Sequence, residues 1–171
     1  RQMCIRDRVT GAAGFIGYHV CRRLLIDKYD VVGFDNLNSY YDISLKEDRL
    51  TNLINLEKRD GILWEFIKGD LENKSLLLEL FEKYQPNIVI NLAAQAGVRY
   101  SLESPESYIS ANLVGFSNIL ECCRVTKIKH LIYASSSSVY GANSKIPFSE
   151  NDKVDKPISL YAVSYTHLEP T

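Results

Sequence analysis

The 171-residue sequence has no apolar run that approaches the length of about 18 residues needed to span a bilayer. It also lacks a surplus of charge of one sign, because 20 basic residues stand against 21 acidic ones. This balance gives no support for the basic surface of a nucleic-acid-binding protein. Residues 1–8 contain no apolar segment of the kind that a signal peptide needs. We therefore expect a cytoplasmic protein without a nucleic-acid or membrane partner.

Cysteine is sparse, with four residues at positions 4, 21, 122 and 123, and none of them forms a Cys-x-x-Cys pair. The three histidines lie far apart in the sequence, so the spacing typical of a metal site is missing. We expect four reduced thiols and no bound metal. With 46% apolar residues, the composition excludes a disordered or collagen-like chain and fits one globular domain.

Short apolar runs alternate with helical patterns along the chain. Runs that are short and rich in β-forming residues, as buried parallel strands are, cover residues 31–35, 64–70, 87–93 and 130–135. The spacing of apolar residues predicts helices over residues 15–27, 73–84 and 107–126. Strands that alternate with helices predict an α/β fold, built as a doubly wound parallel sheet with right-handed crossovers.

Two segments break this pattern. The first strand of such a fold is central and buried, yet the charged residues 6–8 occupy its place, and each charge costs several kcal/mol to desolvate. At the other end, residues 164–171 abandon the helix that we expect after Tyr161. We interpret residues 1–8 and 165–171 as foreign sequence at the two ends of a truncated gene.

Three glycines, at positions 11, 14 and 17, lie between the end of the first strand and the first helix. Such a turn lets the backbone approach a diphosphate closely, and the helix start at about Phe15 offers free N–H groups and the positive end of the helix dipole. Asp35 ends the next strand, 18 residues after Gly17, near the spacing expected for a carboxylate on the adenosine ribose. This carboxylate favours NAD over NADP, because it would repel the 2′-phosphate of NADP.

Several segments resemble the extended short-chain dehydrogenase/reductase family. The three-glycine spacing is one of them, and residues 91–95 (Asn-Leu-Ala-Ala-Gln) resemble the strand end that passes under the cofactor in that family. Asp70 and Asn112 resemble its adenine-contacting aspartate and the helix asparagine that braces its active site. Residues 133–141 and 157–161 resemble the segments that carry its catalytic serine and tyrosine.

The resemblance implies that residues 1–171 form one incomplete, Rossmann-like NAD-binding domain, with the C-terminal substrate domain of the family absent. It also implies NAD as the cofactor and assigns a set of residues to its site. These cofactor-binding residues are Gly11, Gly14, Phe15, Ile16, Gly17, Asp35, Asn36, Asp70, Leu71, Leu92, Ala93, Ala94, Asn112 and Ser135.

Within the family, residues 35–41 and 95–101 are similar to nucleotide-sugar epimerases that act on UDP-glucuronate. That resemblance implies inversion at C4 of the sugar through a transient 4-keto sugar, with NAD as a tightly held catalyst. It assigns Tyr161 as the base and Ser136 as its partner at the sugar O4. It implies substrate binding by Gln95, Arg99, Ser137 and Ser138. UDP-galactose 4-epimerases are the nearest alternative, and 4,6-dehydratases fit less well because no Asp-Glu pair follows Ser136.

The chain departs from the family four residues after the tyrosine, where Tyr165 stands in place of lysine. A free tyrosine has a pKa of about 10, so about one molecule in a thousand is phenolate at pH 7, and a nearby ammonium would lower that pKa. We therefore expect the chain by itself to be inactive, and a non-catalytic NAD-binding protein remains an alternative. The intact enzyme is expected to be a homodimer that pairs through two helices, one of them over residues 107–126.

Overall fold

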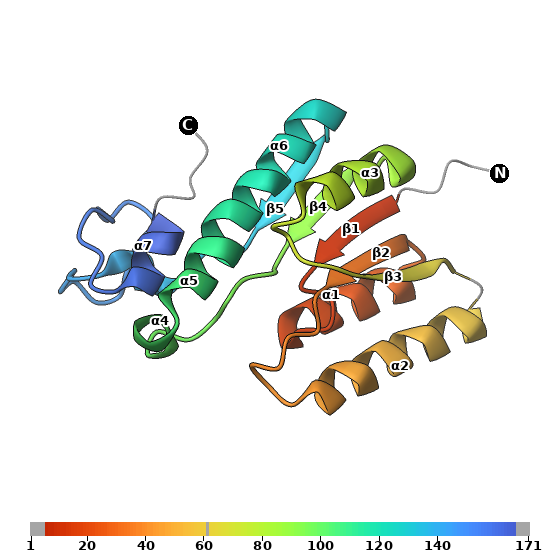
Figure 1. Cartoon of the computed structure of the whole chain (residues 1–171), viewed down its shortest axis with the longest axis horizontal. Coiled ribbons are helices and arrows are strands. Elements are labelled where there is room, and N and C mark those ends of the chain that lie inside the picture. The colour runs from red at the N-terminus through yellow and green to blue at the C-terminus, as the bar shows by residue number, and fades with distance from the viewer. Residues whose placement is uncertain (1–5, 61, 167–171) are drawn as a thin grey trace.

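The computed structural model describes residues 6–60 and 62–166, so Cys4 and the outermost parts of both supposedly foreign ends lie outside the described residues. Its strands form one five-stranded parallel sheet in the order β3-β2-β1-β4-β5 (Figure 1). In chain order these strands are β1 (Arg6–Thr10), β2 (Asp30–Asp35), β3 (Trp64–Lys68), β4 (Ile88–Asn91) and β5 (His130–Tyr133). The prediction of a parallel α/β sheet is confirmed.

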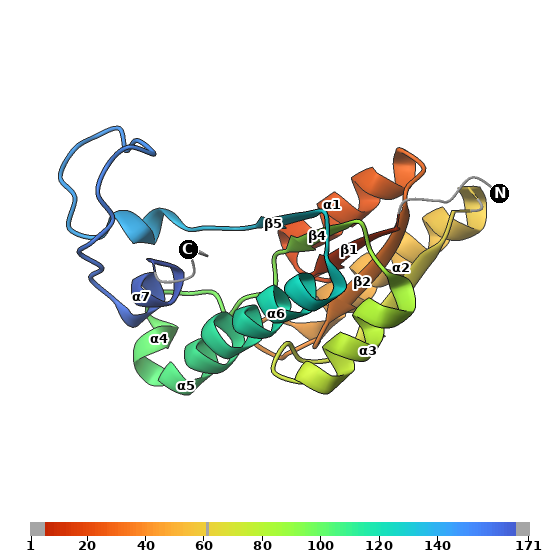
Figure 2. The same ribbon diagram turned by 90° about the horizontal axis from the view of Figure 1, so that it is seen from above.

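Helices cover both faces of this sheet, so the fold is doubly wound as predicted (Figure 2). On one face, α1 (Phe15–Ile26) and α2 (Ile43–Asp60) bury an apolar cluster against Val9, Val31 and Trp64. On the other face, α3 (Lys74–Tyr84) and α6 (Phe116–Thr126) pack against Val32, Phe34 and Val89. The remaining helical segments are α4 (Tyr100–Glu103), α5 (Pro105–Tyr108), a π-helix (Ile109–Gly115), a 3₁₀ turn (Ser137–Tyr140) and α7 (Leu160–Thr166).

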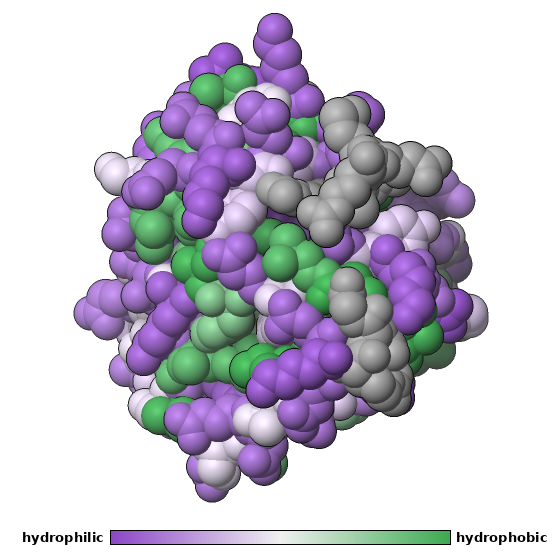
Figure 3. Space-filling view, turned by 90° about the vertical axis from the view of Figure 1, so that its right-hand side faces the viewer, coloured by the Kyte–Doolittle hydropathy of each residue, from purple (hydrophilic) through white to green (hydrophobic). Residues whose placement is uncertain are grey.

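The carboxyl ends of the strands point toward α4, α5 and α7, while their amino ends form the opposite side of the molecule (Figure 1). Figure 3 looks at that opposite side and shows a largely hydrophilic surface with a strip of apolar side chains near its centre. The glycine turn and the serine run both follow carboxyl ends of strands, so the candidate site lies away from this hydrophilic side. No helix within the described residues is long and apolar enough to cross a membrane.

Three helix predictions need correction. The 18-residue α2 is not among the predicted helices, because Leu50 and Leu53 are the only apolar residues that it buries among its described side chains. The helix predicted over residues 107–126 is divided into the end of α5, the π-helix and α6. The expectation that the helix stops near Ser164 is wrong for residues 164–166, which belong to α7 because Ala162 and Ser164 are buried on its inner side.

The charged segment does form the central strand. β1 pairs with β2 on one side and β4 on the other, and it buries Asp7 and Arg8 almost completely. Successive side chains of a strand point to opposite faces, so these two charges lie in different layers. The Arg8 guanidinium lies 4.6 Å from the ring centroid of Phe81, while its Nε, Nη1 and Nη2 atoms have no hydrogen-bond partner among the described residues. Burial lowers the pKa of Arg8 to about 10, because it disfavours the charged form of the guanidinium.

Candidate coenzyme and sugar site

The glycine turn joins β1 to α1 and leaves no room for side chains at two of its three glycines. Gly11 has a φ of +69°, and a Cβ atom there would lie 2.8 Å from the backbone nitrogen of Ala93. A Cβ atom on Gly17 would lie 2.0 Å from the carbonyl oxygen of Gly11, because α1 packs directly on the turn. The Gly14 N–H donates to the same oxygen over 3.0 Å and closes the turn. Gly11 and Gly17 are therefore required by the fold itself.

Gly14 has a different role. Its φ of −68° suits any residue, and a Cβ atom there would meet a single atom, the Gly11 oxygen at 3.1 Å. Gly14 is the N-cap of α1 and supplies no side-chain cap, while Phe15 and Ile16 are 69% and 61% exposed. The N–H groups of the first helical turn are thus open to a ligand. The predicted cradle fits a diphosphate, because the open space lies over Gly14 at the positive end of α1.

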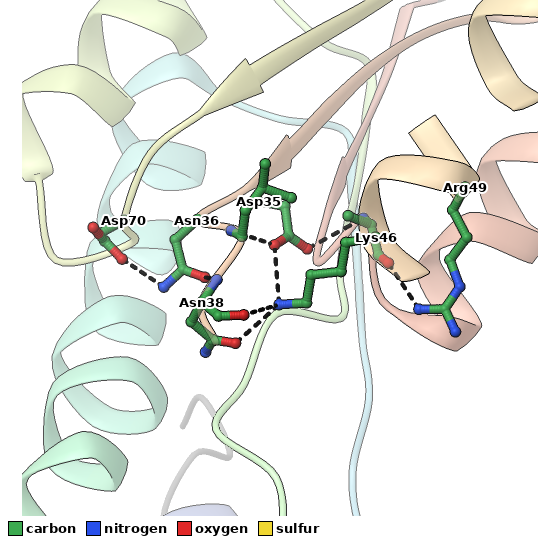
Figure 4. Close-up of polar contacts among 8 residues, drawn as sticks. Asp35, Asn36, Asn38, Lys46, Arg49 and Asp70 are labelled. Carbon is green, nitrogen blue, oxygen red and sulfur yellow. Dashed lines mark hydrogen bonds and ion pairs between the residues drawn. The ribbon is translucent and has the colours of Figure 1, made fainter. Parts of the chain in front are cut away.

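Asp35 ends β2 next to this turn and is almost fully buried. Its Oδ2 accepts a hydrogen bond of 3.1 Å from the Ala13 N–H, and its Oδ1 accepts one of 2.9 Å from the Leu37 N–H. The Lys46 ammonium lies 3.8 Å from Oδ1 (Figure 4). The carboxylate is therefore fixed by two backbone groups and one cation, with further lone pairs left for a ligand hydroxyl.

Asn36 connects this loop to the loop after β3. Its Nδ2 donates a hydrogen bond of 2.6 Å to Asp70 Oδ1, and both side chains lie at the surface edge of the site (Figure 4). Leu71 is placed differently, because its side chain is buried in the core beside α3 and α6. Only the backbone of Leu71 is thus available to a ligand, whereas Asp70 offers its exposed carboxylate.

A small pocket opens between the carboxyl ends of β4 and β5. It is lined by Asn91, Leu92, Ala93, Ala94, Asn112, Phe116, Tyr133, Ala134 and Tyr165. Thr10 fixes its floor, because its hydroxyl donates to Asn91 Oδ1 over 2.6 Å and accepts from the N–H groups of Leu92 and Ala93 over 3.2 Å. The pocket therefore begins beside Gly11 and ends at the helix that carries Tyr161.

Asn112 lies in the π-helix and ties the loop after β4 to α7. Its Oδ1 accepts a hydrogen bond of 2.8 Å from the Gln95 N–H, and its Nδ2 donates to the Gln95 oxygen (3.2 Å) and to Ser164 Oγ (3.0 Å). Ser164 Oγ in turn donates to the Tyr161 carbonyl over 2.8 Å. The buried amide thus holds the loop that contains Gln95 at a fixed place relative to the turn that contains Tyr161.

We predict that Asn112→Asp lowers the free energy of unfolding by about 1–3 kcal/mol at pH 7, because the carboxylate cannot donate to the Gln95 oxygen or to Ser164. Urea denaturation monitored by circular dichroism measures the change. Asn52→Asp, an exposed position on α2, is the matched control and should leave stability within about 0.5 kcal/mol of the parent. Equal stabilities of the two variants would contradict the bracing role.

The serine run and Tyr161 come from neighbouring elements, since α7 packs beside the 3₁₀ turn of residues 137–140. Ser135 and Ser137 are exposed, and Ser136 Oγ accepts a hydrogen bond of 3.2 Å from the Ser138 N–H. The Tyr161 ring stands edge-on to Tyr108, with centroids 6.0 Å apart, and contacts Tyr165 at 5.0 Å. Burial holds the pKa of Tyr165 well above its usual range, so this phenol stays neutral and cannot replace a lysine beside Tyr161.

The two residues predicted to bind the substrate in the loop after β4 differ in accessibility. Gln95 is buried, and its Nε2 donates to the Ala96 carbonyl over 3.2 Å, whereas Arg99 is exposed at the start of α4. Tyr108 supports this loop by donating from its hydroxyl to the Ala96 carbonyl over 2.8 Å, and it also contacts the Gly97 carbonyl. Arg99 is therefore accessible to an anionic ligand, whereas the Gln95 side chain is buried and both of its backbone polar groups are bonded to Asn112.

Sequence reasoning missed a group of polar residues around Asp35, namely Asn38, Lys46 and Arg49 (Figure 4). Lys46 and Arg49 are three residues apart on α2 and both reach the site, but α2 itself is not predicted. The described residues hold no cluster of three or more His, Cys, Asp or Glu side chains that could bind a metal ion. Within the same residues, Cys21, Cys122 and Cys123 are free thiols.

Comparison with known proteins gives consistent matches. The chain is 53% identical over 156 residues to Protein CapI of Staphylococcus aureus (91% of this chain, 45% of that protein). It is 48% identical over 157 residues to UDP-glucuronate 4-epimerase 2 of Arabidopsis thaliana (91% of this chain, 35% of that protein). The chain thus spans less than half of the length of these curated relatives.

Among solved structures, UDP-glucose 4-epimerase from Brucella ovis in complex with NAD superposes with a TM-score of 0.79 at 31% identity, over 96% of this chain and 46% of that one. The enzyme of the same name from Thermus thermophilus, also solved with NAD, gives a TM-score of 0.79 at 31% identity over 96% of this chain and 48% of that one. The family model described as the NAD dependent epimerase/dehydratase family matches residues 8–170. The chain therefore belongs to the NAD-dependent epimerase/dehydratase family.

Proposed function

We propose that the whole protein is an NAD-dependent nucleotide-sugar 4-epimerase that converts UDP-glucuronate to UDP-galacturonate. The observation that carries the proposal is the convergence of four features at one edge of the sheet: the glycine turn after β1, Asp35 at the end of β2, the pocket after β4 and the serine run after β5. In open α/β sheets this edge is where ligands bind. The name of the Arabidopsis relative supports the choice of sugar.

The open backbone at Gly14 would hold the diphosphate of NAD, and Asp35 would accept the hydroxyls of its adenosine ribose. When bound, NAD supplies a reversible hydride acceptor at C4 of the sugar. Tyr161 would take the proton from the sugar O4, and Ser136 would orient that oxygen by a hydrogen bond. These roles need the two hydroxyls close to one another, and the packing of α7 beside the 3₁₀ turn supports this, with Ala134 and Tyr165 next to the two segments lining the pocket.

Arg99, Ser137 and Ser138 would hold the carboxylate of the uronate, and exposure of Arg99 and Ser137 supports that role. Holding this group matters chemically, because the oxidised sugar is a β-keto acid that readily loses carbon dioxide. A fixed carboxylate keeps the carbon–carbon bond out of the geometry needed for that loss. We also infer that the whole protein is cytoplasmic and that it forms a homodimer. The exposed apolar side chains Ile109, Val114 and Val125 on the π-helix and α6 support the homodimer.

The test is a chimera in which this chain, with Tyr165→Lys, is joined to the C-terminal half of the Staphylococcus relative. We expect the chimera to be active, because the new ammonium stabilises the phenolate form of the base and the added half supplies the rest of the sugar site. We expect conversion of UDP-glucuronate to exceed that of UDP-glucose. Tyr161→Phe in the same chimera is the control and should abolish turnover. Faster conversion of UDP-glucose would favour a UDP-galactose 4-epimerase, and NAD binding without turnover of either sugar would favour a non-catalytic NAD-binding protein.

A further inference from the structure

We propose that Lys46 determines the coenzyme selectivity of this site, by cancelling the charge of Asp35 and by being the cation that would receive a 2′-phosphate. Asp35 alone predicts strong rejection of NADP, but the carboxylate does not act alone, because the Lys46 ammonium lies 3.8 Å from it. The inference deepens the proposed function and rests on its coenzyme site.

The position of Lys46 is fixed by its own hydrogen bonds. Both side chains of the ion pair are only 8% exposed. Lys46 Nζ donates to the Asn38 carbonyl over 3.1 Å and to Asn38 Oδ1 over 2.9 Å. Because an ammonium has three N–H donors, the third remains for Asp35 or for a ligand placed beside it. The cation therefore stands at the ribose-binding carboxylate in a defined orientation (Figure 4).

Charge at this position acts directly on selectivity. Without Lys46, a ligand at Asp35 would meet a buried negative charge, whereas with Lys46 the pair is neutral. A phosphate monoester carries a charge of about −1.5 to −2 at pH 7, so the added cation matters far more to NADP than to NAD. Buried charges are screened only weakly by salt, which preserves the effect at physiological ionic strength.

Arg49 adds to the positive side of the same loop. It lies one helical turn after Lys46 on α2, and its Nη1 donates to the Ala13 carbonyl over 3.0 Å. The N–H of the same residue, Ala13, donates to Asp35, so the turn is held between the carboxylate and the guanidinium. α2 thus presents two cations to the ribose side of the glycine turn, and Lys46 is the one in contact with Asp35.

The alternative is that Lys46 merely supports the loop of residues 36–38, in which Leu37 has a φ of +55°. A supporting residue would affect NAD and NADP equally, since it would act on the loop and not on the 2′-phosphate that distinguishes the two coenzymes. A selectivity-determining residue changes the ratio of the two dissociation constants. The ratio therefore separates the two roles, whatever the loss in absolute affinity.

The experiment measures the dissociation constants of NAD and NADP by NMR titration, which detects binding into the millimolar range, for the parent chain and its variants. In Lys46→Met, the preference for NAD should rise about tenfold, because NADP loses its cation and meets an uncompensated carboxylate. In Asp35→Asn, the preference for NAD should fall by about tenfold or more, because NADP then binds more tightly relative to NAD. In the double variant Asp35→Asn/Lys46→Met, this relative gain in NADP binding should be lost. Lys58→Met, an exposed lysine of α2, is the matched control and should leave the ratio unchanged.

Each outcome decides between the two proposals. If the parent chain binds NAD but Lys46→Met leaves the ratio where it was, Lys46 only supports the loop and the inference is wrong, while the coenzyme site stands. If the parent chain binds neither NAD nor NADP, the coenzyme site itself is refuted and the inference with it. A rise in the ratio for Lys46→Met together with no change for Lys58→Met supports both.

Discussion

Replacing Gly17 with alanine is expected to unfold the chain, whereas the same replacement at Gly14 should preserve the fold and weaken coenzyme binding. The Cβ atom that Gly17→Ala introduces would lie 2.0 Å from the carbonyl oxygen of Gly11 and 2.7 Å from its carbonyl carbon. Both are backbone atoms of the turn between β1 and α1, so relief requires the helix to move off the sheet. Ordinary overpacking of a core costs about 1–3 kcal/mol, and this contact, which no side-chain rotation can relieve, should exceed that range.

Gly14 lies in the same turn as Gly17 but has space for a side chain. A Cβ atom on Gly14 meets only the Gly11 oxygen at 3.1 Å, a contact that a small shift relieves. It would instead occupy the space over the N-terminus of α1, where the diphosphate approaches, so NAD affinity should fall by about tenfold or more. Thermal unfolding followed by circular dichroism and NAD titration of the folded variant measure the two effects. A Gly17→Ala chain that melts like the parent, or a Gly14→Ala chain that binds NAD normally, would contradict this division of roles.

Much of the fold is predictable from the sequence because β2, β4 and the helices α3 and α6 bury apolar residues at regular spacing, whereas β5, predicted as a buried strand, lies at the sheet edge with half-buried and exposed residues. α3 is an example, since Leu77, Leu80 and Phe81 recur on one buried side. α2 has no such pattern, because one of its buried positions, beside Leu50 and Leu53, is Lys46. A lysine on the inner side of a helix reads as a solvent-facing residue until its partner is known, and that partner, Asp35, comes from another element.

The candidate site, like the fold, could be predicted from the sequence only in part. The glycine turn and Asp35 are encoded by local spacing, so the sequence predicts that they come together, and the structure places them in contact through Ala13. The π-helix around Asn112 is not encoded locally. It is associated with the long-range bonds from Asn112 to Gln95 and Ser164, and only the folded chain brings these residues together. The contact between Tyr165 and Tyr161 was not predicted either, because it depends on α7, a helix that we did not expect to continue beyond Ser164.

The second large effect is expected from Asp7, whose replacement by asparagine should stabilise the chain at neutral pH. Burial in the central strand raises the pKa of Asp7 to about 6, from an ordinary value of 3.8 in the unfolded chain. The folded state therefore holds the proton more tightly than the unfolded state between these two values. The contribution of Asp7 to stability should therefore be most favourable below about pH 4 and should fall as the pH rises through 6, by a total of about 3 kcal/mol at pH 7.

Asp7→Asn removes this penalty, since a neutral amide is not required to ionise inside the sheet. We expect the variant to unfold at higher urea concentration than the parent at pH 7, and the two curves to converge near pH 4. Asp48→Asn, at an exposed position of α2, is the control and should follow the parent at every pH. Because Arg8 lies on the opposite face of the strand, it cannot relieve the charge of Asp7, and no described residue forms a hydrogen bond with Asp7 Oδ1. A stability profile of Asp7→Asn that still falls between pH 4 and 6 would show that another group carries the proton.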